Sequence, residues 1–494
     1  MTELPFPAEE ERPAPLGRRV MAAVAFAGTA RLVVQVTSWL MTLVVIRLLT
    51  PADYGLMGLV TLFTGFVAMF NELGMGAALV QARRVTGTLL AELFGLVLLL
   101  QILFGLLILV AAAPVADFFG EPRLVPMLQV QSLQFLFYGF AVVPDALLMR
   151  RLDFQRKSLV ETVAALLASG ATLLLAFTGF GVWALIDGVL IGAATRALGL
   201  TWITRFLPMP RLRLSGLGGL VRFGGLLTAE RLLWFGYTRF DAMIIGKRFG
   251  PVLLGDYTVA MTLASLPLDK LGPVLTQVSF PAFAEVQERP GEATAHLLKA
   301  VRLLSLLFFP LLFGLAAVAS DAVPLLLGAQ WTASVVPLTL ISLVMPLRMI
   351  NLVIPSYLKG LGHPGASLLT IGVACLILPA ALLVGSRWGL AGIGAAWLFS
   401  YPVFFLASLS IAARVTPLRI APVLAAILRP ALAASLMLLL LWLAQSTLLA
   451  PLAPGLRLPL AIAFGIACYA VAILLLDRSG CRELLALLRH RAIA

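Results

Sequence analysis

The chain has 494 residues, of which 61% are hydrophobic and 12% charged, and its mean hydropathy is +1.03. So few polar side chains cannot cover a water-soluble body of this size. The formal net charge of +13 does not indicate a nucleic-acid partner, because the basic residues form short clusters between apolar runs and not one continuous face. The composition therefore predicts an all-α polytopic membrane protein.

The chain begins with a polar segment and continues as a series of apolar runs. Residues 1–15 are rich in proline and mix glutamate with arginine, so we expect a disordered cytoplasmic N-terminus. The next run is longer than a signal-peptide core and should stay as a helix. A bilayer takes about 20 apolar residues per helix. We predict fourteen such helices, with approximate limits 20–46, 55–79, 88–113, 124–146, 158–178, 182–204, 218–245, 254–283, 298–319, 334–358, 365–385, 389–412, 424–446 and 457–476.

Lysine and arginine are distributed unevenly between alternate loops. One set of loops is rich in them, for example at Arg83, Arg84, Arg156, Lys157, Arg211 and Arg213. The other set carries only Arg47, Arg123, Lys247, Arg248, Arg387 and Arg457. Because basic loops remain on the cytoplasmic side, this distribution predicts that both termini are cytoplasmic.

The two halves of the chain resemble each other, as in transporters built from repeats. The sequence LTPADYG at residues 49–55 resembles GPVLLGDY at residues 250–257, with Asp53 aligned to Asp256. Further matches pair residues 118–120 with 326–328 and residues 143–148 with 354–359. We infer two parallel six-helix lobes, at residues 16–213 and 214–420, followed at 421–494 by a helix pair and a basic cytoplasmic tail.

Polar side chains inside the apolar runs are candidates for a transport site, because a charge in hydrocarbon is costly. The first run carries Arg31, Gln35, Ser38 and Thr42 on one helical stripe. Hydroxyl stripes also allow helices to pack closely, and this purely structural role is an equal alternative for them. The second lobe adds Arg231, Arg239, Lys270 and Arg348. We predict that Arg31, Gln35 and these four basic residues line a cationic, substrate-binding cavity.

Acidic residues in the same region have two possible roles. Glu230 and Asp241 lie on a different side of the seventh helix from Arg231 and Arg239, and Asp269 lies in the eighth. These carboxylates either couple transport to an ion or form structural pairs with basic groups.

No catalytic, metal or cofactor site is expected. The three cysteines form no CxxC pair, and the three histidines lie far from them and from each other. No GxxxxGK[ST] loop occurs, so the chain has no recognisable nucleoside triphosphate site.

Several strings together resemble the polysaccharide transporter family. They are VVIRLLTPADYGLMG from residue 44, NELGMGAALVQ from residue 71, PDALLMRRLDF from residue 144, DAMIIGKRFGPVLLGDY from residue 241 and FPAFA from residue 280. The family includes Wzx-type oligosaccharide flippases and belongs to the multidrug/oligosaccharidyl-lipid/polysaccharide flippase superfamily.

The resemblance has consequences for architecture and function. It implies two six-helix lobes in a V around a cationic cavity. It also implies passage of an undecaprenyl-diphosphate-linked oligosaccharide, or of an exported polysaccharide, across the bacterial inner membrane. Such a protein would work beside a polysaccharide polymerase and glycosyltransferases in cell-surface polysaccharide biosynthesis, such as that of lipopolysaccharide or exopolysaccharide.

Three alternatives stay open at this point. A multidrug exporter would share the fold, but its cationic substrates suit an acidic cavity better. A membrane glycosyltransferase or polymerase would be an enzyme, in which Asp53 could act as a catalytic acid. A structural scaffold would not need so many charges inside its helices.

The predicted orientation is tested by cysteine labelling in a protein without its native cysteines. A cysteine at position 84 or 156 should react with a membrane-impermeant thiol reagent only after the cytoplasmic side is exposed. Reaction in intact cells at either position would contradict the predicted topology.

Overall fold

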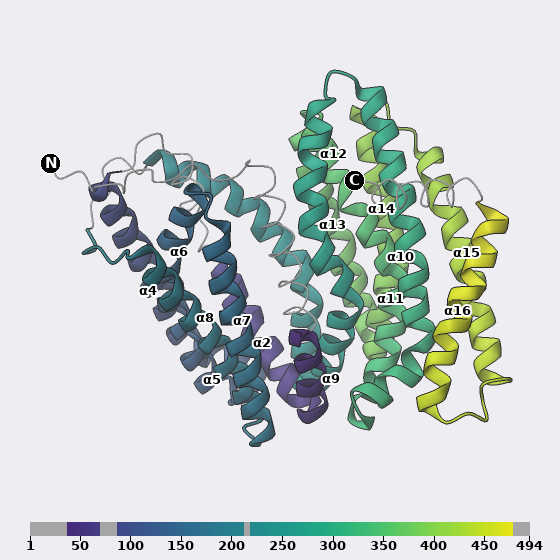
Figure 1. Ribbon diagram of the computed structural model, residues 1–494, viewed down its shortest axis with the longest axis horizontal. Helices are drawn as coiled ribbons and strands as arrows, with labels where there is room; N and C mark the ends of the chain where they lie inside the picture. The colour runs from purple at the N-terminus through teal and green to yellow at the C-terminus, as the bar shows by residue number, and fades with distance from the viewer. Residues whose placement is uncertain (1–36, 70–85, 212–217, 478–494) are drawn as a thin grey trace, which may run out of the picture. The chain divides into compact units, whose positions relative to one another are not determined.

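The computed structural model describes residues 37–69, 86–211 and 218–477, and within the last range the side chains of residue 233 and of residues 235–477. Every regular element in these ranges is a helix. Figure 1 shows them in chain order: a helix over Thr37–Leu48, α2 (Pro51–Ala68), α4 (Gly87–Phe119), α5 (Leu124–Gln131), α6 (Leu133–Arg150), α7 (Phe154–Phe177), α8 (Val182–Thr204), α9 (Gly218–Glu285), α10 (Pro290–Leu326), η1 (Ala329–Ser334), α11 (Val335–Asn351), α12 (Val353–Gly360), α13 (Pro364–Gly385), η2 (Ser386–Trp388), α14 (Gly389–Val415), α15 (Ile420–Ser446) and α16 (Pro454–Leu476).

Eleven helical segments among the described residues are long and apolar enough to cross a membrane. Two of them, Phe235–Glu285 and Pro364–Val415, each cover parts of two predicted helices. The first predicted helix lies mostly outside the described residues, and Thr37–Leu48 is its described end. The prediction of an all-α polytopic membrane protein is confirmed, and about fourteen crossings are consistent with these segments.

Contacts divide the chain into two compact units. Unit 1 consists of Met1–Val45, Gly74–Gly105 and Leu133–Leu220, and unit 2 consists of Ile46–Leu73, Leu106–Ser132 and Val221–Ala494. The boundary between them passes through α4. The predicted domain limits at 15, 213 and 420 follow the order of the helices along the chain and stay a prediction.

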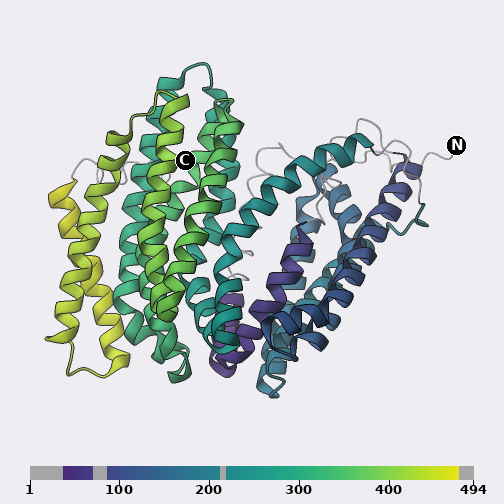
Figure 2. The same ribbon diagram turned by 180° about the vertical axis from the view of Figure 1, so that it is seen from behind.

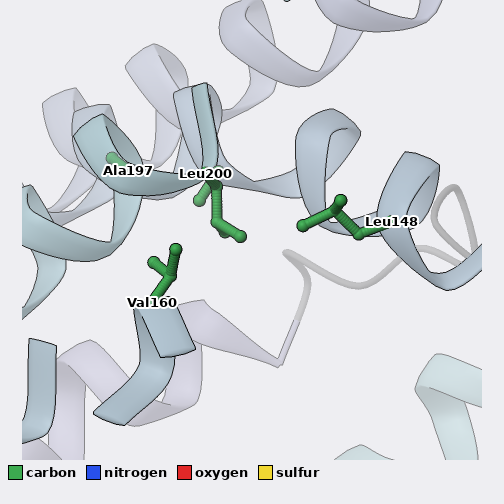
Figure 3. Close-up of a cluster of buried hydrophobic side chains, with 5 residues drawn as sticks. Leu148, Val160, Ala197 and Leu200 are labelled. Carbon is green, nitrogen blue, oxygen red and sulfur yellow. The ribbon is translucent and has the colours of Figure 1, made fainter. Parts of the chain in front are cut away.

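In unit 1, α8 packs closely against α7 because small residues face the contact. A Cβ atom added to Gly188 would lie 1.8 Å from Thr172 Oγ1, and one added to Gly199 would lie 2.8 Å from Val160 Cγ1. Beside this contact, Leu148, Val160 and Leu200 form a buried apolar cluster with two alanines (Figure 3). Lipid is as apolar as leucine, so close packing of this kind, and not escape from water, holds the helices together.

In unit 2, α15 and α16 are fixed to α10 along its length, as the view from behind also shows (Figure 2). Asp477 pairs with Arg302 near one end of α10, and Arg457 pairs with Asp321 near the other end. Between these ion pairs, the Tyr469 hydroxyl donates to the Leu306 carbonyl at 3.1 Å. The C-terminal helix pair is therefore a fixed part of unit 2.

The long element α9 consists of two helices that meet at Gly250. This glycine has φ 77° and ψ −177°, outside the helical region, and Pro251 begins the second helix. In the same way, Thr50 caps α2 and Pro51 begins it. The two helices are therefore equivalent in where they begin: each starts with a proline directly after a non-helical residue.

This equivalence corrects the alignment of the repeat. Pro51 corresponds to Pro251 and Gly55 to Gly255, whereas the sequence comparison aligned Asp53 with Asp256, three positions further along. The Asp-Tyr dipeptide that guided the sequence comparison has different roles in the two turns. Asp53 accepts from the Thr50 backbone N–H at 2.9 Å in a capping box, whereas Asp256 accepts from the Ser334 hydroxyl at 2.8 Å.

The sparse basic residues of the second loop set are mostly held by specific contacts. Arg123 pairs with Glu121 through two nitrogens at 2.6 and 2.9 Å, and its hydrogen bonds lower the pKa of that carboxyl group. Arg248 donates to the Ser386 hydroxyl, and Arg457 pairs with Asp321. These exceptions to the charge distribution therefore have structural roles.

The apolar cluster of unit 1 is tested by truncating Leu200, which is fully buried. We expect Leu200→Ala to lower the free energy of unfolding by roughly 1–3 kcal/mol, less than a water-soluble core would lose, because lipid already solvates the unfolded helices. Leu198→Ala is the matched control, since Leu198 is 72% exposed. Equal effects in a detergent denaturation experiment would contradict the packing described here.

Candidate functional site

Unit 2 contains a cavity of about 450 Å³ between α9, α11, α12, α13 and α14. Its described lining includes two basic residues, Arg348 and Lys359, and no acidic residue. The wall also carries aromatic, hydroxyl and amide side chains, from Tyr237, Phe280, Tyr401, Phe404, Thr238, Thr276, Ser356, Thr370, Gln277 and Asn351, and six apolar residues, Leu268, Pro281, Leu352, Pro355, Ile371 and Ala374. Such a surface suits a ligand that is anionic, hydroxylated, or both.

Arg348 is the half-buried cation of this cavity and lies on α11. Its guanidinium carbon is 4.7 Å from the centre of the Trp397 ring and 5.9 Å from that of Tyr401. One nitrogen also lies 3.7 Å from the Met261 sulfur. Among the described residues, no carboxylate lies within 4.0 Å of Arg348. Aromatic faces and a thioether hold its position without neutralising its charge.

Asn351 lies one helical turn beyond Arg348 and contributes to the cavity wall, where it is 9% exposed. Its Oδ1 atom is itself buried and has no hydrogen-bond donor among the described residues. A buried acceptor without a donor is costly, so this amide is a polar exception in the wall.

A buried hydrogen-bonded chain connects Asp241 to the ring on which Arg348 stacks. Tyr257 donates its hydroxyl proton to Asp241 and accepts from the Trp397 indole N–H at 2.8 Å. Asp241 also accepts from the backbone N–H of Ala242 at 2.7 Å, and its side chain is 3% exposed. The partners of Asp241 are therefore neutral groups, and no described basic residue forms an ion pair with it.

The other predicted site residues fall into two groups. Arg239, Lys270 and Asp269 are exposed and do not line the cavity, and Asp269 accepts from the Ser265 hydroxyl at 2.8 Å. Arg31 and Gln35 lie outside the described residues, as do the side chains of Glu230 and Arg231. Of the six predicted substrate-binding residues, the described structure brings Arg348 alone to this cavity.

Sequence reasoning missed Lys359, Asn351 and Tyr401 as members of the site. Lys359 was assigned to a cytoplasmic loop because it follows the predicted tenth helix. Asn351 was the detectable signal, since an amide inside an apolar run needs a partner. Tyr401 gave no signal, because aromatic residues are common in membrane helices.

The sequence matches the family of polysaccharide biosynthesis proteins over residues 44–336. The chain belongs to this family. Among its relatives are the lipopolysaccharide biosynthesis protein WzxC of Escherichia coli K12, 25% identical over 328 residues, and the succinoglycan biosynthesis transport protein ExoT of Rhizobium meliloti, 26% identical over 317 residues. The matched part covers 66% and 64% of this chain, and it spans 64% of the length of each relative.

Solved structures of other proteins share the fold of this chain. The lipid II flippase MurJ in an inward closed conformation superposes with a TM-score of 0.74 at 14% identity, covering 92% of this chain and 99% of MurJ. An inward-facing multidrug resistance transporter of the MATE family gives 0.59 at 18% identity, covering 76% and 95%. At these identities the likeness concerns the fold alone.

The Asp241 chain is tested by removing its central hydroxyl group. Tyr257→Phe leaves one oxygen of the buried Asp241 carboxylate and the Trp397 N–H without the partner described here, at a cost of roughly 1–3 kcal/mol for each. Tyr469→Phe is the control, because it removes a half-buried hydroxyl group that donates to the Leu306 carbonyl oxygen. We expect the thermal unfolding midpoint in detergent to fall clearly further for Tyr257→Phe, and equal shifts would contradict the chain described here.

Proposed function

We propose that this chain moves an oligosaccharide linked to undecaprenyl diphosphate across the bacterial inner membrane by alternating access, as a step in cell-surface polysaccharide biosynthesis. Membership of the polysaccharide biosynthesis family supports this proposal. So does the name of ExoT as a transport protein for succinoglycan biosynthesis.

The cavity around Arg348 is the observation that carries the proposal. A guanidinium group presents planar, paired donors that fit phosphate oxygens. The neighbouring aromatic rings offer flat faces to sugar rings, and the hydroxyl and amide side chains of the wall can bond sugar hydroxyl groups. The polar head of the lipid would pass through the protein while its hydrocarbon tail remains in the membrane.

A multidrug exporter is the main alternative, and the MATE-like fold is compatible with it. Acidic groups favour the binding of cationic drugs, whereas the described lining of this cavity carries two basic residues and no acidic one. The charge of the cavity therefore favours an anionic substrate.

The candidate catalytic acid of the enzyme alternative, Asp53, has a structural role. Asp53 accepts from both the backbone N–H and the hydroxyl of Thr50, at 2.9 and 2.7 Å, and thereby caps α2. This structural role explains the residue without catalysis. We propose a non-enzymatic transporter that acts together with a polymerase and glycosyltransferases.

Two further features belong to the proposal. Both termini are cytoplasmic, as the loop charges predict. Asp241 couples transport to an ion, because a buried carboxylate whose described hydrogen-bond partners are neutral is stabilised by binding a proton or a cation.

The function is tested in a strain that lacks this chain and receives it on a plasmid. Arg348→Gln should lower the rate of glycan export about tenfold or more while the protein level is unchanged, since a charged hydrogen bond contributes roughly 1.5–3 kcal/mol. Arg348→Lys should restore part of the rate, because it keeps the charge but loses the planar fork.

The matched control for this experiment is Arg387→Gln, which removes a positive charge from an exposed position outside the cavity. It should export normally. Normal export by Arg348→Gln would exclude this cavity as the substrate site, and normal export without the chain would exclude the proposed function.

A further inference from the structure

The helix α2 and the second helix of α9 cross with almost no space between their backbones. A Cβ atom added to Gly55 would lie 1.6 Å from the Pro251 carbonyl oxygen. A Cβ atom added to Gly255 would lie 1.7 Å from the Pro51 carbonyl oxygen. The contact is reciprocal: each glycine faces the proline that begins the equivalent helix of the other repeat.

Basic residues before the two helices repeat this reciprocity. Arg47 donates to the Leu325 carbonyl oxygen at 3.0 Å, in the last turn of α10. Lys247 donates to the Phe118 carbonyl oxygen, in the last turn of α4, and lies 4.6 Å from the centre of the Phe118 ring. The carbonyl groups at a helix C-terminus lack intrahelical partners and carry partial negative charge, so a cation binds there favourably.

The corrected alignment makes these two contacts equivalent. It pairs Arg47 with Lys247 as it pairs Pro51 with Pro251. Each basic residue therefore ends the first helix of one repeat and caps a helix that the other repeat contributes. The two caps are therefore two copies of one device, one from each repeat.

A buried tryptophan and its neighbour bind the backbone at Arg47. The Trp331 indole N–H donates to the Ile46 carbonyl oxygen at 2.9 Å, and the Gln330 amide donates to that of Arg47 at 2.9 Å. The Trp331 ring is fully buried and meets Tyr54 edge to face, with ring centres 5.5 Å apart.

These contacts explain how unit 2 is composed. It includes Ile46–Leu73 and Leu106–Ser132, which come from the first half of the sequence, while other parts of that half form unit 1. These two segments of the first repeat therefore associate with the second repeat.

We propose that the glycine crossing and its two basic caps form a latch that closes one end of the transport path, and that both caps release together when that end opens. The inference rests on the proposed transport function, because alternating access requires one end to part while the other closes. By the loop charges, the latch lies on the outer side of the membrane. Its caps suit reversible release, since Arg47 and Lys247 are exposed and water can replace the carbonyl groups that they leave.

Locking the latch is the first test. A Cβ atom at position 58 would lie 3.2 Å from Thr258 Oγ1, which places two cysteines at Gly58 and Thr258 within reach of a disulfide bond. In a protein without its native cysteines, oxidised Gly58→Cys/Thr258→Cys should lose glycan export, and a reductant should restore it. The two single-cysteine variants, treated with the same oxidant, are the controls.

Releasing the latch is the second test. Leu254 is fully buried and lies against Gly58 in the crossing, so a cysteine there reports when the crossing opens. Arg47→Gln combined with Lys247→Gln should raise the rate at which an impermeant thiol reagent labels Leu254→Cys from outside, by about tenfold if each cation contributes what an exposed cation at a helix C-terminus usually does. Arg387→Gln is the control and should leave the rate unchanged.

The two tests separate the latch from the proposed function. If export requires the chain but the oxidised pair exports normally, the latch is wrong and the function stands. If export does not require the chain but the labelling rate rises in the double variant, the function is wrong and the latch stands. An unchanged labelling rate in the double variant overturns the latch whatever the export result.

Discussion

Two glycines facing two carbonyl groups determine how α2 and the second helix of α9 cross. Because a methyl group at Gly55 or Gly255 would overlap a proline carbonyl oxygen, this geometry requires the smallest residue at both positions. The crossing in turn depends on where the two helices begin. The capping box of Thr50 and Asp53 fixes where α2 begins, the kink at Gly250 fixes where the second helix of α9 begins, and these starting points bring the two glycines opposite the prolines.

The lipid solvent imposes the second constraint, since a polar group inside the membrane must find its partner within the protein. Most hydroxyl groups in the spans satisfy it locally. Thr258 and Thr262 each donate to the carbonyl four residues earlier, both at 2.7 Å. These two hydroxyl groups, in the predicted helix at 254–283, are therefore satisfied within their own helix. The exceptions are more informative: Asn351 keeps an acceptor without a donor, and Arg348 keeps a charge without a carboxylate in the described residues.

The sequence predicted the helices well, because apolar runs of membrane length have few alternative structures. It placed the repeat three positions out of register, because the Asp-Tyr dipeptide is more conspicuous than the spacing of proline and glycine that governs the turn. One amino-acid sequence by itself does not reveal which carbonyl group a glycine faces across a helix crossing.

The site was predicted only in part, for a related reason. Helical spacing places Arg239 and Asp241 on different sides of one helix, yet it does not say what each side meets. In the structure Asp241 meets Tyr257, which comes from beyond the kink at Gly250, while Arg239 is exposed. The cavity collects residues from five helices, and Arg348 belongs to it because Trp397 and Tyr401 of α14 support its guanidinium group.

The central claim is that this chain alone carries a lipid-linked saccharide from one leaflet to the other. Reconstitution tests it most directly: the purified protein is placed in liposomes with a fluorescent oligosaccharide linked to undecaprenyl diphosphate, and the fraction accessible to an impermeant quencher is followed in time. We expect protein-containing liposomes to move label between the leaflets, and liposomes with the oxidised Gly58→Cys/Thr258→Cys protein to match empty ones. An accessible fraction that stays constant with the native protein, under conditions where its fold is intact, would contradict the account.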